Sequence, residues 1–299
     1  MQRSHVVPRP GGLIRRIADS DWFWIMLIWI VTMLLRYGLT CMLLFVAADQ
    51  ALAQTERGTR RPLIAGEVLR YKVKWLLVRL GTVTIRQVPA DSGRVLVQMS
   101  VQSAQGLPFI NVHFENQTMV SERSQSLDEE TIHSVDDPTE KTVYWHDWGT
   151  GQLMMVDSLR GKQTRRDSLS WEKECYDALG LLMYSRRFAA SGISTSLPTL
   201  NDYKIAETEV SFANGTEQIE VDAFDTPRRC HLVSGMARWV GKSFAGMKGP
   251  FRGWITDDEA AIPLRAKVEI FLGSIVLELE SYECPANNAG IRLVHTISK

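Results

Sequence analysis

The chain has 299 residues, of which 45% are hydrophobic and 23% are charged, and it contains 34 basic and 34 acidic residues. These values are typical of a globular protein and exclude a disordered chain. A formal net charge of +0 argues against a partner such as nucleic acid, which needs a basic surface.

The N-terminal part has the composition of a secretory signal. Residues 22–35 are strongly apolar, Arg36 interrupts them, and a second apolar run covers 39–48. This run is followed by Ala51-Leu52-Ala53, the small-x-small pattern that signal peptidase recognises. We therefore predict that 1–53 is a signal peptide, cleaved between Ala53 and Gln54.

Two other interpretations of this segment stay open. Translation can begin at Met33, because residues 33–53 alone have the proportions of a complete signal peptide. Alternatively, 22–48 is an uncleaved anchor, since it exceeds the roughly 20 apolar residues that a membrane span needs. In every case the sequence predicts an exported protein, either periplasmic or associated with the envelope.

The exported part contains three cysteines. An oxidising compartment permits a disulfide, but an odd number leaves one thiol over and the spacing selects no pair. The three cysteines are Cys175, Cys230 and Cys284. A polar lead-in is expected at 54–62 and a single domain at 63–299.

Alternation of apolar and polar residues, the pattern of a half-buried strand, dominates this domain. It is clearest in the first strand, where Leu69, Tyr71 and Val73 alternate with basic residues. Strands are expected at 69–77, 81–86, 94–102, 110–115, 141–148, 151–159, 203–213, 216–224, 230–240, 251–256, 262–272 and 274–283.

One helix interrupts the strands. Residues 174–190 carry Leu179, Leu182 and Met183 at helical spacing, and Arg186 and Arg187 suit the negative end of the helix dipole. The predicted fold class is therefore all-β and mainly antiparallel: a curled sheet, open barrel or sandwich with one inserted helix, preceded by an N-terminal hydrophobic helix.

Several short motifs predict turns. Asn214-Gly215 lies between two alternating runs and is the strongest short hairpin signal, and Gly273-Ser274 predicts another tight connection. Acidic clusters at 128–130, 136–137 and 257–259 are expected to be turns as well, because Asp favours local backbone hydrogen bonds. The last of them is also the sequence's candidate for binding a hard cation, the less favoured interpretation.

Four segments, in order along the chain, resemble a known bacterial envelope family. They are the opening Gly66-Glu67 with Tyr71 and Trp75, the helix with Asp177 before it and Tyr184-Ser185-Arg186 at its end, Trp254–Glu259 with Pro263, and Gly273-Ser274 with Leu279. This pattern resembles the family catalogued as domain of unknown function 3108, although Thr256 stands where a serine is commoner. The resemblance implies an exported antiparallel β domain and supplies no catalytic residues.

Motifs for chemistry are weak. His146-Asp147 looks most reactive, but adjacent strand residues point to opposite faces, so we expect the two side chains to diverge. No metal or cofactor motif is present, and we predict neither; whether the chain is an enzyme stays open, with binding favoured.

Two functional hypotheses remain. The first is a carrier that encloses a lipid or other apolar envelope component in a curled sheet. Its candidate apolar face comprises Tyr71, Trp75, Val97, Phe114, Phe271 and Leu279. The second is a structural or assembly protein that contacts another envelope protein.

A mixed basic and aromatic loop is the candidate contact for a partner or a membrane surface. It comprises Lys242, Phe244, Lys248, Phe251, Arg252 and Trp254.

Overall fold

A computed structural model describes residues 63–106, 113–121, 128–134, 140–171, 173–201, 203–239, 249–270 and 273–285. By its contacts the chain divides into two units, Met1–Glu56 and Arg57–Lys299. The first unit, with the predicted signal peptide and its cleavage site, lies outside the described residues, and so does the lead-in at 54–62. Everything below concerns the second unit.

The described part of this unit is built mainly of β-strands. They are β1 (Val68–Trp75), β2 (Val78–Pro89), β3 (Arg94–Ser103), β4 (His113–Ser121), β5 (Asp128–Ser134), β6 (Glu140–Asp147), β7 (Gln152–Leu159), β8 (Lys162–Ser170), β9 (Ser194–Asn201), β10 (Lys204–Ile219), β11 (Arg228–Ala237), β12 (Gly249–Thr256), β13 (Pro263–Glu269) and β14 (Ser274–Glu283). A short 3-10 turn, η1 (Asp91–Gly93), and one α-helix, α3 (Ala178–Phe188), complete the described elements.

All fourteen described strands belong to one sheet with the order β8-β7-β6-β5-β4-β3-β2-β1-β14-β13-β12-β11-β10-β9. Neighbouring strands are antiparallel throughout. The sheet is not closed, because β8 and β9 each have only one partner. The predicted fold class, a curled antiparallel sheet with one inserted helix, is confirmed.

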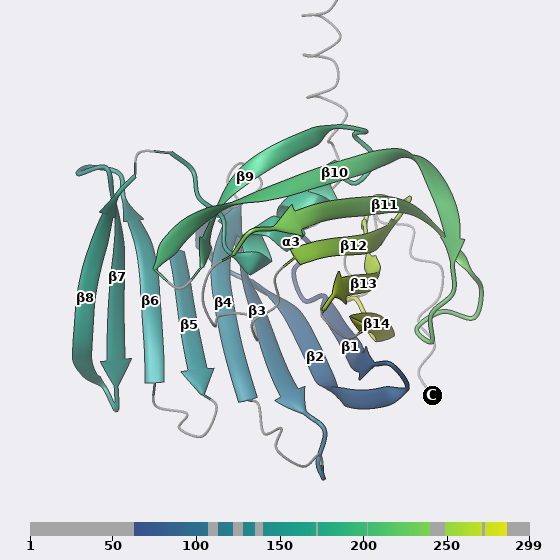
Figure 1. Ribbon diagram of the computed structural model, residues 1–299, viewed down its shortest axis with the longest axis horizontal. Coiled ribbons are helices and arrows are strands. Elements are labelled where there is room, and N and C mark those ends of the chain that lie inside the picture. Colours follow the sequence, from purple (N-terminus) through teal and green to yellow (C-terminus); the bar gives the residue numbers. More distant parts are fainter. Residues whose placement is uncertain are drawn as a thin grey trace, which may run out of the picture. The chain divides into compact units, whose positions relative to one another are not determined.

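The helix α3 connects the two edge strands and lies against the concave face of the sheet (Figure 1). There, Leu179 and Met183 pack with inward side chains of β1, β2, β3, β13 and β14 in the main hydrophobic core. The opposite side of the helix, with Leu181, packs against β10, β11 and β12 in a second cluster. The helix therefore fills much of the space that the curled sheet surrounds.

Helix α3 is shorter than the predicted 174–190, and it begins directly after Asp177, the residue that the family resemblance places before the helix. Asp177 is its N-cap, and its carboxylate accepts hydrogen bonds from the Gly180 amide at 2.7 Å and the Thr118 hydroxyl of β4 at 2.5 Å. This side chain satisfies one of the free amides at the helix start and also ties the helix to the sheet.

The predicted hairpin at Asn214-Gly215 is wrong. Both residues lie inside β10, which pairs with β11 on either side of an irregularity between Phe212 and Thr216. The extra residues form a bulge, which lets one long strand bend instead of ending (Figure 1).

The sequence also missed some strands. Asp128–Glu130, expected in a turn, begins β5. Strand β8 was not predicted because an exposed edge strand shows no apolar alternation, and β9 was missed although Leu197 and Leu200 in it are buried. The second acidic cluster, 136–137, lies outside the described residues. The third, 257–259, forms the expected turn after β12, where the Asp258 carboxylate accepts a hydrogen bond from the Ala261 amide at 2.9 Å.

No disulfide joins Cys175, Cys230 and Cys284 to one another. The part of the chain that the structure describes holds no helix with the length and apolar character of a bilayer crossing.

Candidate functional site

An apolar cavity of about 230 Å³ lies between helix α3 and the concave face of the sheet. The helix supplies one wall, and inward side chains of the central and C-terminal strands supply the others. The lining includes Tyr71, Val83, Ile85, Leu179, Leu182, Val210, Val233, Phe251, Ala266, Val268 and Leu277. A wall of this kind is suited to a hydrocarbon group.

Several polar groups of the cavity wall are engaged in the fold. The Tyr71 hydroxyl donates to the Pro263 carbonyl at 2.9 Å, and burial raises the pKa of this tyrosine, which therefore stays neutral. The Trp239 indole donates to the Thr208 hydroxyl at 2.8 Å. These contacts provide shape and rigidity, which is what binding requires, and do not assemble a reacting group.

The structure brings together members of the two groups of site residues that the sequence suggested. Tyr71 from the apolar face lines the cavity, and so do Phe251, Arg252 and Trp254. These three were predicted as part of the mixed loop, but they lie on strand β12 instead. Trp254 is also held by its indole, which donates to the Glu217 carboxylate at 2.7 Å.

The remaining predicted site residues lie elsewhere. Val97, Phe114 and Leu279 pack in the main core with the helix and are not part of the cavity lining, and Trp75 ends strand β1. Four further members lie outside the described residues: Phe271, Lys242, Phe244 and Lys248.

Sequence reasoning missed the wall that helix α3 contributes. Leu179 and Leu182 were predicted to lie on the apolar side of a helix, but nothing local indicated which surface that side covers. Helical spacing identifies a buried stripe and carries no information about its partner.

The most reactive-looking pair, His146 and Asp147, diverges as expected. The His146 ring bonds the Trp171 carbonyl through Nε2 at 2.7 Å and stacks on Trp148. A hydrogen bond with the Thr150 side chain, together with bonds from the Gly149 and Thr150 amides to the carboxylate, lowers the pKa of Asp147. Asp147 therefore stabilises the β6–β7 turn, whereas His146 joins β6 to the residue that follows β8.

A second histidine–carboxylate pair was invisible in the sequence. His231 Nε2 lies 2.8 Å from the Asp257 carboxylate, which also contacts Arg229 at 3.2 Å. The neighbouring thiol offers no nucleophile, because burial raises the pKa of Cys230 to about 12. Among the described residues, no group of three or more ligating side chains is placed to hold a metal ion.

Two of the segments that resemble the known family meet in a buried polar network, through Glu67 and Arg186. Arg186, predicted near the C-terminal end of the helix, is fully buried, and its guanidinium contacts the Glu67 carboxylate at 2.6 and 2.8 Å. It also donates to the carbonyls of Ala260 and Ala261, while Gln87 donates to Glu67 at 2.5 Å. The guanidinium of Arg186 is thus bonded to groups of the protein itself, and the network holds helix α3 against the sheet.

The hydroxyl at position 256 belongs to the same region. Thr256 Oγ1 accepts from the Ile262 amide and donates to Asp258, each at 2.8 Å. A serine hydroxyl can make the same two bonds, which explains why threonine is compatible with this motif.

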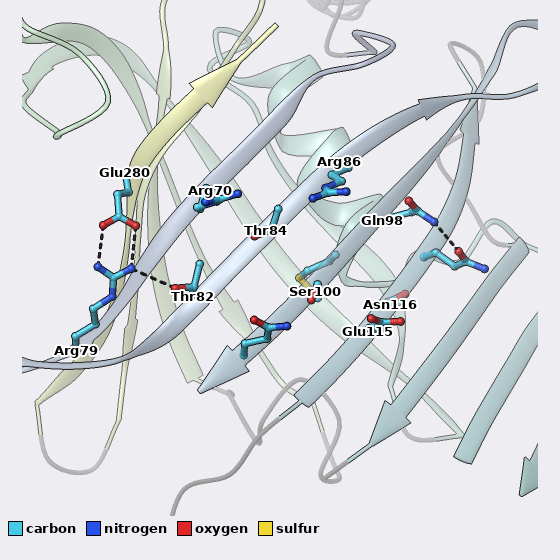
Figure 2. A pocket seen from close by; sticks show the side chains of 13 residues that line it. Arg70, Arg79, Thr82, Thr84, Arg86, Gln98, Ser100, Glu115, Asn116 and Glu280 are labelled. Carbon is cyan, nitrogen blue, oxygen red and sulfur yellow. Dashed lines mark hydrogen bonds and ion pairs between the residues drawn. The ribbon is translucent and has the colours of Figure 1, made fainter. Parts of the chain in front are cut away.

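The convex side of the sheet carries a polar groove of about 610 Å³ over β1–β4 and β14 (Figure 2). Arg79 makes two 2.8 Å contacts with Glu280, and Gln98 bonds Gln117 at 3.1 Å. Much of the groove is thus a solvated sheet surface whose side chains pair with one another.

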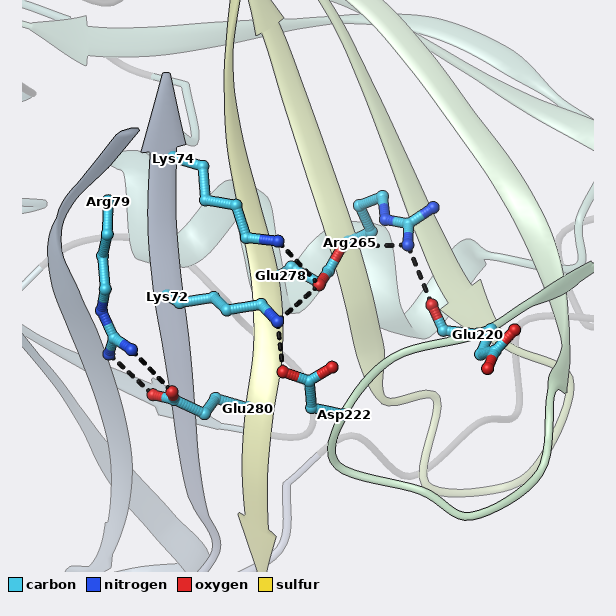
Figure 3. A network of polar contacts seen from close by, with 8 residues as sticks. All are labelled: Lys72, Lys74, Arg79, Glu220, Asp222, Arg265, Glu278 and Glu280. Atoms are coloured by element: carbon cyan, nitrogen blue, oxygen red, sulfur yellow. Dashed lines mark hydrogen bonds and ion pairs between the residues drawn. The ribbon is translucent and has the colours of Figure 1, made fainter. Parts of the chain in front are cut away.

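Next to this groove, acidic and basic side chains form a network on the outer face of β1, β13 and β14 (Figure 3). Glu278 is its centre, contacting Lys72 at 2.8 Å, Lys74 at 3.2 Å and Arg265 at 3.0 Å. Lys72 also pairs with Asp222, which follows β10.

Comparison with known proteins bears on the family and on the fold. The family model described as "Protein of unknown function (DUF3108)" matches residues 70–280. Among curated proteins, none matches this chain.

Two solved structures are similar to the chain. A β-barrel-like protein of domain of unknown function DUF1849 from Brucella abortus has a TM-score of 0.54 and 9% identity, covering 75% of this chain and 100% of that one. The hypothetical protein CT021 from Chlamydia trachomatis has a TM-score of 0.32 and 10% identity, covering 77% and 91% of the two chains. The first likeness supports a barrel-like β fold.

Proposed function

We propose a non-catalytic binding role for this chain, which belongs to DUF3108, a family of proteins of unknown function. The proposed ligand is a short apolar chain, such as the acyl group of an envelope lipid. The apolar cavity between α3 and the sheet is the observation that carries this proposal.

The size of the cavity limits the ligand. At about 230 Å³ it is smaller than the roughly 300–1,000 Å³ of pockets for drug-sized molecules. A short hydrocarbon segment fits this space, whereas a whole phospholipid does not. Helix α3 fills the rest of the space on the concave face, which also leaves room for a short ligand alone.

The test is titration calorimetry of the purified full chain with decanoate, comparing Ala266→Leu with Ala90→Leu. Ala266 lines the cavity, whereas Ala90 lies between β2 and η1, outside the lining. Leucine adds three carbons to the cavity at position 266. At about 0.8 kcal/mol per methylene, the displaced contacts weaken binding by roughly tenfold or more.

We expect the wild-type protein and Ala90→Leu to bind decanoate equally and Ala266→Leu to bind it at least about tenfold more weakly. Equal affinity in all three, or no saturable binding in the wild type, would contradict the proposal. Native mass spectrometry of the purified protein adds a second readout. A co-purifying acyl ligand supports the carrier, and a co-purifying protein with an empty cavity supports an assembly role.

We also propose that the protein acts after export, in the periplasm or at the envelope. The support is the apolar segment that ends in Ala51-Leu52-Ala53. Intact mass measurement on protein from separated cell fractions tests this. An exported species beginning at Gln54 is expected, and an uncleaved cytosolic species would contradict export.

A further inference from the structure

The hairpin between β1 and β2 ends in three exposed aliphatic side chains. Leu76, Leu77 and Val78 are 62%, 100% and 49% exposed. The other exposed large hydrophobic residues of the described part, Val88, Trp148 and Leu159, are separate from one another in the sequence. Single exposed apolar residues are ordinary, whereas three in succession at one tip indicate a contact surface.

The backbone of this turn does not favour leucine. Trp75 pairs directly with Val78, so Leu76 and Leu77 form a two-residue hairpin loop, and Leu76 has a φ of 53°. Such loops favour glycine, asparagine or aspartate, which adopt a positive φ at lower cost. Leu76 is thus unfavourable for the local conformation, and both leucines are unfavourable for solubility. Sites that break local rules in this way are frequently functional.

The charges beside the tip identify the partner. Lys74 and Arg79 face each other across the hairpin on the outer face, close to the turn. Their carboxylate partners, Glu278 and Glu280, lie on β14, where Glu278 pairs in register with Lys72, farther from the tip (Figure 3). The end of the hairpin therefore carries two cations that are ion-paired and partly exposed, and both lie nearer the apolar tip than their carboxylates. Trp75 belongs to the same end. This is the combination found in segments that enter the interface of an anionic membrane.

The small size of the tip argues against a protein partner. A stable protein interface buries about 800 Å² on each side. Three side chains at a hairpin end supply only a fraction of that area, but they suffice to enter the acyl boundary of a bilayer.

We propose that Leu76, Leu77 and Val78 insert into the surface of a lipid bilayer containing anionic lipids, with Lys74 and Arg79 at the headgroups. This inference does not depend on the apolar cavity. The two features nevertheless lie at the same end of the strands, because the cavity residue Val268 pairs with Ile275, which pairs with Trp75.

The experiment places an environment-sensitive fluorophore at the tip of the full chain. Leu77→Cys is labelled with a nitrobenzoxadiazole group, and Leu159→Cys is the matched control at another exposed leucine. Unsubstituted protein treated in the same way gives the background from native cysteines. Because the label reports its own surroundings, the result does not depend on how the rest of the chain attaches to vesicles.

With vesicles of phosphatidylcholine and phosphatidylglycerol in equal parts, the label at position 77 should shift to shorter wavelength and gain intensity. The label at position 159 should not change. A smaller response is expected with phosphatidylcholine alone, because the cations then lack anionic headgroups. Equal responses to both vesicle types would overturn the role of Lys74 and Arg79.

A water-like signal at position 77 in the presence of vesicles would overturn the proposal. So would a signal that rises with protein concentration in the absence of vesicles, because it would identify a second copy of the chain as the partner. A double variant, Leu76→Gly with Leu77→Asn, places glycine at the first loop position, where the backbone has a positive φ. It should unfold at the same or higher denaturant concentration, and it should leave a label at Val78→Cys exposed to water.

Discussion

Glu67 and Arg186 form a fully buried ion pair that joins the start of the sheet to the helix. Removal of one partner leaves the other charge buried without compensation, which costs about 3–5 kcal/mol. We expect Arg186→Met to lower the free energy of unfolding by this amount in urea denaturation. The double variant Glu67→Leu with Arg186→Met should recover much of the loss, since neither charge remains. A single variant as stable as the wild type would show that the pair does not hold the helix.

Glu278 makes the stability of the fold depend on pH. Partial burial disfavours its charge, but hydrogen bonds from Lys72 and Lys74 outweigh burial and lower its pKa. At pH values between this lowered pKa and the ordinary glutamate pKa of about 4.3, this carboxyl group binds more protons in the unfolded chain than in the folded one. The stabilisation by Glu278 is therefore present above about pH 4.3 and is lost as the pH falls through the folded pKa.

We therefore expect Glu278→Gln to be less stable than the wild type at neutral pH, with a difference that shrinks in acid. Urea denaturation at a series of pH values measures this. Glu269→Gln, at an exposed site on β13, is the control and should follow the wild-type profile. A difference between Glu278→Gln and the wild type that does not change with pH would contradict the assignment.

At the scale of elements, the pairing of β10, β11 and β12 depends on Gly235. This residue lies opposite Phe251, whose ring covers it, and a Cβ at this position would lie 2.0 Å from the Glu209 carbonyl oxygen. Because a backbone oxygen cannot move aside easily, Gly235→Ala should destabilise the protein by about 1–3 kcal/mol, as overpacking does.

Gly215 in the β10 bulge is the matched control for this substitution. It is exposed, and a Cβ there would meet nothing within 4 Å. The free energy of unfolding of Gly215→Ala, measured by thermal unfolding, should stay within about 0.5 kcal/mol of the wild-type value. Comparable losses in both variants would mean that strand propensity, and not the close approach at Gly235, controls the effect.

The elements also show where local patterns suffice. The strand at Leu69 and Tyr71 was predicted because its buried and exposed residues alternate, and β1 has this arrangement. Asn214-Gly215 has the chemistry of a turn, yet pairing with β11 continues through a bulge, so tertiary contacts override the local preference. Edge strands such as β8 lack a buried face and thus lack the signal altogether.

On the scale of the whole molecular unit, a sheet that does not close surrounds a helix that connects its two edges. The main core includes residues from the first described strand, the last one and α3. Closure of the hydrophobic interior is therefore achieved by the helix and not by pairing between β8 and β9. The apolar cavity exists because the helix leaves one end of this interior unfilled.

The sequence by itself determined the all-β class, the inward faces of the central strands, the existence of the helix and the family resemblance. These follow from patterns within a few residues, because side-chain direction in a strand or helix repeats over two or about 3.6 positions. Only the tertiary structure decided that Arg186 meets Glu67, 119 residues away, and that Tyr71 and Phe251 share one cavity. Contacts between distant segments leave no local pattern, since they depend on how the whole sheet curls around α3.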